Sequence, residues 1–384
     1  MKKISLSLVA MVSISLTSTL SANTLSDALS NGKISGDLSA TYEVRDLKKD
    51  LNAYYQDTQY SVGSIGLNYK TADFYNFGAN VGFRAYKTLF EDDSDKVTST
   101  GFGDASERFY ETGKNRNADL ESAYISYDLE NLHIKAGRQA LSTEWIDKTQ
   151  DAVSLFTSLN DTDVEMIWTN RHGRINSRDY RPMTQVNPGN GGLYKLGITQ
   201  NFTDNISAKA YGLTAPSLKD IYGGKLNFKN SVNDIDFGAM AHYAQTNEDV
   251  NNVENSNVLE LKTFASLAGY TATLGFVKID KDAEFKHIAG ETINPFEEGD
   301  QIYLKDAKTT YLMLGKEIAD IKFTALYGIT KYEEFKKSEF NLWAAYELVK
   351  NLDLNIGYAF TNEDNSDENT TNLQQLNATI AYMF

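Results

Sequence analysis

Apolar and polar residues alternate along much of the chain with a period of two. In the segment 373–384, every second residue from Leu376 to Phe384 is apolar or aromatic, and the residues between them are mostly small or polar. Such alternation predicts β-strands with one apolar and one polar face. The same pattern recurs at 34–46, 77–88, 234–246, 321–331 and 352–361. The chain is therefore predicted to be all-β.

The last strand of this pattern indicates where the apolar faces point. It ends on the aromatic Phe384, directly after Tyr382 and Met383. A soluble sheet seldom ends on an exposed aromatic side chain, whereas a strand facing lipid places aromatic rings at the membrane interface. The pattern therefore favours a barrel in an outer membrane over a secreted β-sandwich or solenoid.

The connections between predicted strands alternate in length. Short turns are predicted at 71–73, 129–131, 171–173, 202–205, 229–233, 268–269, 319–320 and 349–351. The connections between them are mostly longer and more acidic, which is typical of bacterial barrels with short periplasmic turns and long external loops. We predict a transmembrane antiparallel up-and-down β-barrel of 18 strands, with 16 as the alternative. The seventh strand, placed near Arg174, is required by the even count more than by its own pattern.

The start of the chain predicts export. Lys2 and Lys3 precede an apolar run from 4 to 20, and the small residues Ser21 and Ala22 follow it. This order is that of a secretory signal peptide, predicted here as 1–22 and cleaved after Ala22. The remaining residues, 23–384, are predicted to form a single barrel domain. Its expected location is the outer membrane of a Gram-negative cell, in contact with membrane lipid and lipopolysaccharide.

Composition narrows the class of protein further. The chain has 23 Tyr and 19 Phe but only 4 Pro, which suits many long strands. It has no Cys, so disulfides, thiolate metal sites and cysteine nucleophiles are excluded. The net charge of −15 argues against nucleic acid as a partner. Acidic residues gather in predicted external loops at 91–95, 248–254, 297–300 and 363–368, either as solvated tips or as sites for divalent cations.

Motifs for catalysis are missing from the sequence. There is no G-x-S-x-G, H-E-x-x-H, P-loop or G-x-G-x-x-G motif, and the four histidines are scattered. We therefore predict no enzyme activity, no cofactor and no metal site. Two alternatives to a channel stay open: a barrel that anchors a surface or adhesive structure, and an outer-membrane barrel hydrolase.

The sorting of charge between strand faces suggests a pore. Strict alternation places several basic side chains on the polar, lumen-facing side, among them Arg84, Lys135, Lys209, Lys225 and Lys322. If the third external loop, 142–160, folds into the barrel, its acids would face an arginine-rich segment across a constriction. The acids are Glu144, Asp147 and Asp151, and the arginines are Arg171, Arg174, Arg178 and Arg181. Opposed charges of this kind orient polar solutes. We predict passive diffusion of ions and small polar solutes, with a lean to small organic anions.

The segment Lys135-Ala136-Gly137-Arg138-Gln139, the arginine-rich segment and the terminal Tyr382-Met383-Phe384 together resemble the OprD-like porins. The likeness extends over 23–384 and is greatest to porins and major outer-membrane proteins of epsilonproteobacteria. The resemblance implies 18 strands, an inward third loop, a homotrimer and a ladder of basic side chains that leads solutes through the pore. Along this chain the ladder would comprise Lys135, Arg138, Arg171, Arg174, Arg178 and Arg181. Phe384 is expected to engage the barrel-assembly machinery.

Overall fold

The computed structural model describes residues 22–47, 57–92, 105–110, 117–364 and 372–384. The predicted signal peptide lies outside these residues except for Ala22. No helix in the described ranges is long and apolar enough to cross a membrane. The helical elements are short: α1 (Leu25–Ser30), α2 (Glu107–Tyr110) and the 3-10 helix η2 (Asp300–Tyr303).

Strands make up most of the described chain. They are β1 (Lys33–Leu47), β2 (Thr58–Lys70), β3 (Phe77–Glu91), β4 (Ala118–Asp128), β5 (Leu132–Thr143), β6 (Ile146–Leu159), β7 (Thr162–Ile175), β8 (Tyr180–Gln185), β9 (Leu193–Asn201), β10 (Ile206–Ala215), β11 (Lys219–Val232), β12 (Ile235–Glu248), β13 (Asn257–Leu267), β14 (Tyr270–Ile279), β15 (Lys308–Ile318), β16 (Ile321–Tyr332), β17 (Phe335–Val349), β18 (Leu352–Glu363) and β19 (Leu373–Met383).

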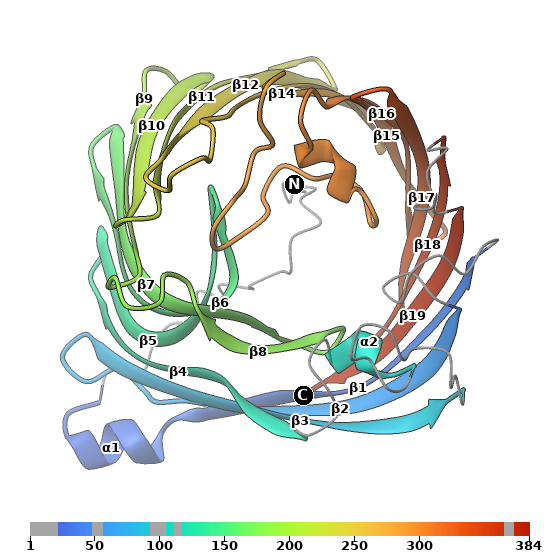
Figure 1. The fold of residues 1–384 in the computed structure, drawn as a ribbon. Helices are drawn as coiled ribbons and strands as arrows, with labels where there is room; N and C mark the ends of the chain where they lie inside the picture. The colour runs from blue at the N-terminus through green and yellow to red at the C-terminus, as the bar shows by residue number, and fades with distance from the viewer. Residues whose placement is uncertain (1–21, 48–56, 93–104, 111–116, 365–371) are drawn as a thin grey trace.

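These strands form a closed ring, as Figure 1 shows. Each strand pairs antiparallel with the next except β8, which pairs with β7 alone; β7 also pairs directly with β9, and β19 pairs with β1 to close the barrel. At the seam, Gly36 and Phe384 exchange two backbone hydrogen bonds of 3.0 Å. The described residues form 19 strands. One of them, β8, lies inside the ring and pairs with the external end of β7, so 18 strands make up the wall. The prediction of an 18-stranded antiparallel barrel is confirmed.

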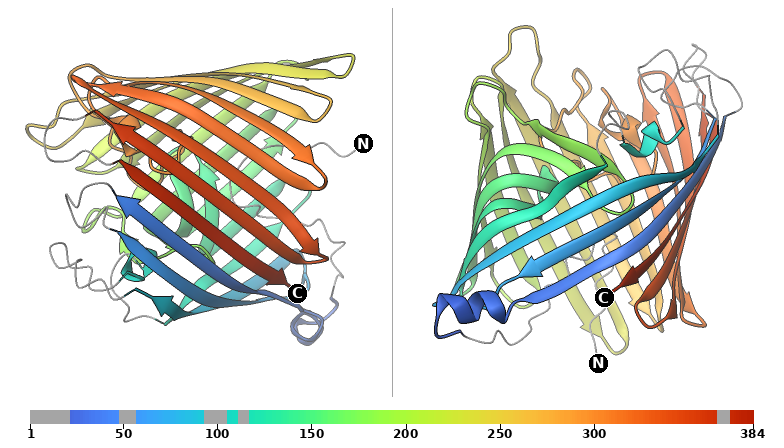
Figure 2. Two further views of the ribbon diagram at one scale, coloured as in Figure 1. Left: turned by 90° about the vertical axis from the view of Figure 1, so that its right-hand side faces the viewer. Right: turned by 90° about the horizontal axis from the view of Figure 1, so that it is seen from below.

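Alternation within each strand sorts side chains between lipid and lumen. In β19, Leu376, Ile380 and Tyr382 are exposed on the outer face, whereas Gln375 and Thr379 point inward and are buried. Both termini of the described chain lie at the same end of the barrel, together with α1 and the short turns (Figure 2). This end is the periplasmic one, because short turns mark that side in bacterial barrels.

Two predicted connections were wrong. The segment 142–160 is not a loop: most of it is wall strand β6, joined to β5 by a tight turn at Glu144 and Trp145. The side chains of β6 meet polar partners inside the barrel, so the segment contains many polar residues. This polar composition led to the prediction of a loop. The turn predicted at 171–173 is part of continuous strand β7, and the true short turn is at 160–161, where Asn160 has a φ of 54°. The predicted seventh strand corresponds to β8, which lies inside the ring.

The two errors cancel in the strand count. The unrecognised strand β6 replaces the predicted strand near Arg174, so the total remains even and the direction of every later strand is unchanged.

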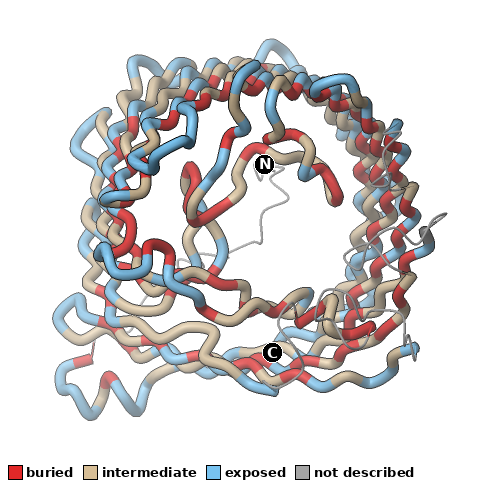
Figure 3. Tube along the Cα trace, viewed as in Figure 1, coloured by how far each residue is buried: buried red, intermediate tan, exposed pale blue. Residues whose placement is uncertain are grey.

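Connections at the external end fill part of the barrel interior (Figures 1 and 3). The residues 280–307 between β14 and β15, here called the inner loop, bury Phe285, Ile293 and Ile302. The helix α2 buries Phe109 and Tyr110 against Tyr86 and Tyr180. Since these apolar contacts anchor the inner loop and α2 to the wall, the lumen is narrowed by packed elements.

The alternation can be tested by placing one charge on each face of the closing strand. Ala378→Arg, on the outer face at the middle of β19, is expected to lower the free energy of unfolding by about 2–4 kcal/mol, because a cation there faces hydrocarbon. The measurement is urea unfolding of the protein in lipid vesicles. Asn377→Arg is the control, because its side chain would face the lumen, where Glu297 lies 3.3 Å from the present amide. Equal losses in both variants would contradict the assigned faces.

Candidate functional site: the charged interior of the barrel

The turn between β5 and β6 lies inside the barrel and is held there by contacts with the wall and with the inner loop. The β4–β5 ladder ends at the pair Ala123 and Arg138, and beyond it the hairpin bends into the lumen (Figure 1). Trp145 at its tip is fully buried, packs 4.7 Å from the Phe285 ring and donates a 2.8 Å hydrogen bond to Tyr211. The hairpin tip is therefore attached both to the wall and to the inner loop.

The departure from the wall occurs next to a glycine. Gly137 has a φ of +128°, and a Cβ on it would lie 2.2 Å from the carbonyl oxygen of Ala123. No side chain fits there, so the glycine permits this backbone path. It lies between Lys135 and Arg138, two residues of the predicted basic ladder.

Glu144 at the hairpin tip is surrounded by ammonium groups from three wall strands. Its carboxylate lies 2.9 Å from Lys195, 2.6 Å from Lys209 and 3.0 Å from Lys225. Glu165 shares two of these lysines, at 2.7 Å from Lys195 and 2.9 Å from Lys209. We call these five residues the lysine cluster. Burial would raise the pKa of Glu144, but the three lysines outweigh it and hold that pKa well below its ordinary range.

The acidic partners of the arginines therefore differ from those predicted. Glu144 faces lysines and not the arginine-rich segment. Asp151 makes a two-pronged ion pair with Arg138, at 2.7 and 3.1 Å, and Asp119 holds the same guanidinium at 3.2 Å. Asp147 pairs with the neighbouring Lys148 at 3.4 Å, and its backbone amide donates to the inner loop at Ala289.

The arginine-rich segment, 171–181, runs from the end of β7 into β8 and crosses the barrel interior (Figure 1). Arg171 donates to the Met183 carbonyl at 3.0 Å, and Arg174 pairs with Asp179 at 3.2 Å. Arg174 and Arg181 are direct partners in the β7–β8 ladder. The structure thus gathers all four predicted arginines on one internal hairpin.

The inner loop supplies the acids opposite this hairpin. Between 288 and 304 it carries Glu291, Glu297, Glu298 and Asp300 and no Lys or Arg. Glu297 reaches Arg178 at 3.0 Å, with the two side chains 22% and 48% exposed. Glu298 is nearly buried and contacts Arg45, and it lies 3.5 Å from Arg108. Arg178 therefore meets an acidic partner from the inner loop, a segment that was predicted to be an external loop.

The carboxylates of the inner loop differ in how readily they take a proton. Burial raises the pKa of Glu291, and nearby Asp300 raises it further. The pKa of Asp300 is likewise raised, because protein atoms crowd its carboxyl group within the barrel and the charge of Glu298 is near. The pKa of Glu298 is instead lowered, because Arg45, Arg108 and Lys337 outweigh its burial. Part of the acidic wall therefore neutralises before ordinary carboxyl groups do as the pH falls.

The remaining predicted pore residues lie apart from this opposition. Arg84 is buried on β3 between Asp37, at 2.5 Å, and Glu121, at 3.0 Å. Lys135 lies over the Tyr124 ring, 5.1 Å from its centre. Lys322 is exposed near the periplasmic end of β16.

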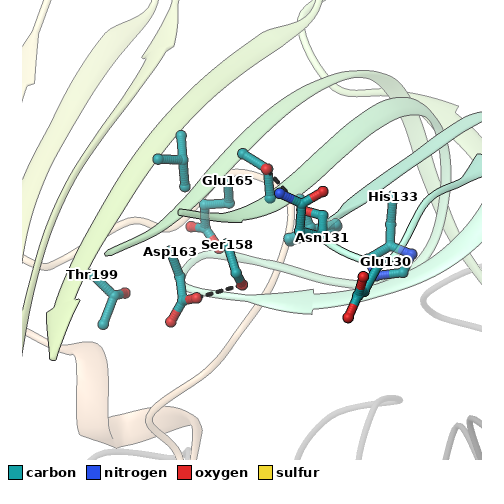
Figure 4. Close-up of a pocket in the computed structure, with 10 residues that line it drawn as sticks. Glu130, Asn131, His133, Ser158, Asp163, Glu165 and Thr199 are labelled. Carbon is teal, nitrogen blue, oxygen red and sulfur yellow. Dashed lines mark hydrogen bonds between the residues drawn. The ribbon is translucent and has the colours of Figure 1, made fainter. Parts of the chain in front are cut away.

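A pocket of about 270 Å³ opens on the inner wall at the periplasmic side of the lysine cluster (Figure 4). Its acidic and polar lining includes Glu130, His133, Asp163 and Glu165, with Ser158 donating a 2.6 Å hydrogen bond to Asp163. Within the described part of the chain, no group of three or more His, Asp or Glu side chains is arranged to hold a metal ion.

Comparison with known proteins defines the family. The model of the Gram-negative porin family matches residues 86–366. The chain belongs to this family. No curated protein matches it significantly. Porins are diffusion channels of the outer membrane and not enzymes, so the predictions of outer-membrane location, transport and no catalysis are confirmed.

Solved structures share the porin's fold across nearly its whole length. Acinetobacter baumannii OccAB4 has a TM-score of 0.75 at 14% identity, covering 92% of this chain and 98% of that one. Pseudomonas aeruginosa OpdK, crystallised with vanillate, has a TM-score of 0.74 at 12% identity, with coverage of 93% and 99%. Pseudomonas aeruginosa OccK9 (OpdG) has a TM-score of 0.76 at 14% identity, with coverage of 93% and 99%. The predicted OprD-like fold is confirmed, and the special closeness to epsilonproteobacterial porins stays a prediction.

The inward fold of the inner loop is the main feature of the candidate site that the sequence prediction missed. A signal was present, because 280–307 contains Phe285, Ile288, Ile293 and Phe296, more apolar residues than an exposed loop needs. An external connection of a porin that carries both buried apolar side chains and clustered acids is better interpreted as folding inward.

Glu144→Gln tests whether the lysine cluster holds the hairpin tip in place. Removing the charge leaves three lysines with Glu165 alone, so the free energy of unfolding is expected to fall by about 3–5 kcal/mol. The measurement is urea unfolding in vesicles. Glu284→Gln, which breaks an exposed pair with Lys286, is the control and is expected to cost less than about 1 kcal/mol. Equal stability of Glu144→Gln and the parent protein would refute this role.

The difference in stability between the parent protein and Glu144→Gln is expected to depend on pH. Since the folded-state pKa of Glu144 is lowered, its stabilisation is fully present above its unfolded pKa of about 4.3 and is lost as the pH falls below it. The parent protein is therefore expected to lose more stability than Glu144→Gln between about pH 5 and pH 3.

Proposed function

We propose that this porin passes small polar solutes through a constriction between the arginine-rich segment and the inner loop, with a preference for small organic anions. The constriction comprises Arg171, Arg174, Arg178 and Arg181 on one side and Glu291, Glu297, Glu298 and Asp300 on the other. Charges of opposite sign on facing walls create a transverse field that orients dipolar solutes and disfavours apolar ones.

The preference for anions rests on one observation, the unequal exposure of the two walls. Arg171 and Arg178 are exposed and Arg174 and Arg181 are partly exposed, whereas on the acidic wall only Asp300 is exposed, Glu291 and Glu297 are partly exposed and Glu298 is buried. A passing solute therefore meets guanidinium groups more fully than carboxylates. Guanidinium groups bind carboxylates through paired hydrogen bonds, which makes small carboxylates the favoured class.

The lysine cluster supports the same preference deeper in the barrel. It combines three ammonium groups with two carboxylates, a formal charge of +1. Lys225 is 24% exposed and faces a single carboxylate, Glu144, whereas Lys195 is fully buried between two. The similar OpdK channel, crystallised with vanillate, gives an example of a carboxylate held by the same fold.

We further propose how the porin reaches and occupies its membrane. The predicted signal peptide 1–22 would be cleaved on export, and Phe384 at the seam would engage the barrel-assembly machinery. Assembly into a homotrimer is the expectation from the resemblance to OprD-like porins. Crosslinking in intact outer membranes, read as the mass of the crosslinked species, tests this expectation.

Neutralising the exposed arginines tests the proposed constriction. Arg174→Gln combined with Arg178→Gln is expected to lower the anion-to-cation permeability ratio several-fold, because the exposed positive charge is lost while the inner-loop acids remain. The measurement is the reversal potential in a planar bilayer under a KCl gradient. Lys331→Gln, which removes an exposed lysine on the outward face at the external end of β16, is the matched control. An unchanged permeability ratio in the double variant would show that these arginines do not set the ion selectivity.

The raised pKa values of Glu291 and Asp300 predict a pH dependence of selectivity. As the pH falls from 7 toward 5, these carboxyl groups gain protons before ordinary ones, while the arginines stay charged. The parent channel is therefore expected to become more anion-selective over this range. Glu291→Gln with Asp300→Asn should be more anion-selective at pH 7 and nearly constant with pH. A pH response retained in this variant would assign it to other groups.

A further inference from the structure

The outer wall of the barrel carries a groove on β13 to β16, close to the periplasmic turns. Its volume is about 460 Å³, and its lining is almost entirely apolar. Three alanines that face outward form its floor: Ala265, Ala272 and Ala325. The strand registers place Ala265 opposite Ala272, Ala272 opposite Leu314, and Leu314 opposite Ala325, so these four residues form one transverse row.

Bulky side chains border this row on both sides. Toward the periplasm, the next outward row is Leu267, Tyr270, Lys316 and Phe323. Toward the membrane centre, the next row contains Leu274, Leu312 and Tyr327, which are 54%, 44% and 51% exposed. The alanines of β13, β14 and β16 leave a hollow between the two bulky rows, and Leu314 on β15, which is 49% exposed, projects into it. The hollow lies where the wall meets hydrocarbon chains.

A single cation is fixed at the periplasmic rim of the groove. The Lys316 ammonium lies 3.6 Å from the centre of the Tyr270 ring and donates a 2.9 Å hydrogen bond to the Ala268 carbonyl in the turn. Among the described residues, the ion pairs do not include Lys316. An ammonium group can donate three hydrogen bonds, so Lys316 retains capacity for an anion. Its attachment to the turn places it at headgroup level, above the hydrocarbon that the groove faces.

We propose that this groove binds one glycerophospholipid of the periplasmic leaflet, with an acyl chain over Ala265 and Ala272 and against the side of Leu314, and the phosphate on Lys316. Charge and shape both favour a lipid over a second copy of the chain. A protein with a net charge of −15 repels anionic headgroups overall. The fixed ammonium group of Lys316 beside the apolar groove can instead attract one anionic headgroup at this place. The aromatic ring of Tyr270 lies between the ammonium group of Lys316 and the apolar groove, at the level where aromatic side chains gather in membrane proteins.

The test uses the full-length protein in detergent, titrated with phosphatidylglycerol or phosphatidylcholine and analysed by native mass spectrometry. The parent protein is expected to retain one phosphatidylglycerol in preference to phosphatidylcholine. Lys316→Gln should lower phosphatidylglycerol occupancy at least fivefold and abolish the preference. Ala272→Leu should lower the occupancy of both lipids, because the leucine fills the floor of the groove.

Two controls match these variants. Lys331→Gln removes an exposed lysine at the external end of β16, and Ala378→Leu enlarges an outward residue on β19. Both should bind lipid as the parent does. Equal occupancy in the parent, Lys316→Gln and Ala272→Leu would overturn the proposal. So would a change of oligomeric state in Ala272→Leu, measured by light scattering, because it would show that a second copy covers the groove.

Discussion

The structure depends on the hydrogen-bonded seam between β1 and β19. A strand in hydrocarbon cannot leave its amides and carbonyls unpaired, so a sheet can cross a membrane only when its first and last strands meet. Here the pairing extends from Asp37 and Met383 to Leu47 and Leu373, and Gly36 continues it to Phe384. Closure fixes the lumen as a separate, aqueous compartment, and this compartment is what allows charged side chains such as Arg45 and Glu298 to gather inside a membrane protein.

Once the ring is closed, the interior is shaped by elements that return into it. The hairpin tip meets the inner loop through Trp145, Phe285 and the backbone contact between Asp147 and Ala289. The arginine-rich segment meets the inner loop through the ion pair of Arg178 with Glu297. Apolar packing positions these elements, and ion pairs then set the charge that faces the solute. The hairpin tip shows both effects. Trp145 fixes its position by apolar packing, and the neighbouring Glu144 pairs with three wall lysines.

The sequence was informative where one physical constraint acts on every residue of a segment. Outward residues from 352 to 360 and from 376 to 384 meet lipid at each second position, so their pattern has a period of two. It was least informative at 142–160, because β6 meets polar partners inside the barrel and lacks a clean contrast between faces. It also misplaced the inner loop, whose acids resemble those of a solvated surface loop when Phe285 and Ile293 are overlooked.

By itself, the sequence determined the barrel, the even strand number and the orientation of most strands. These features follow from local alternation and from composition, which need no knowledge of distant contacts. Tertiary structure alone decided which acids oppose which bases. Glu144 is 51 residues from Lys195, and Arg178 is 119 residues from Glu297. Such pairs form because the closed ring and the packed inner loop bring distant segments together, and no periodicity along the chain encodes that meeting.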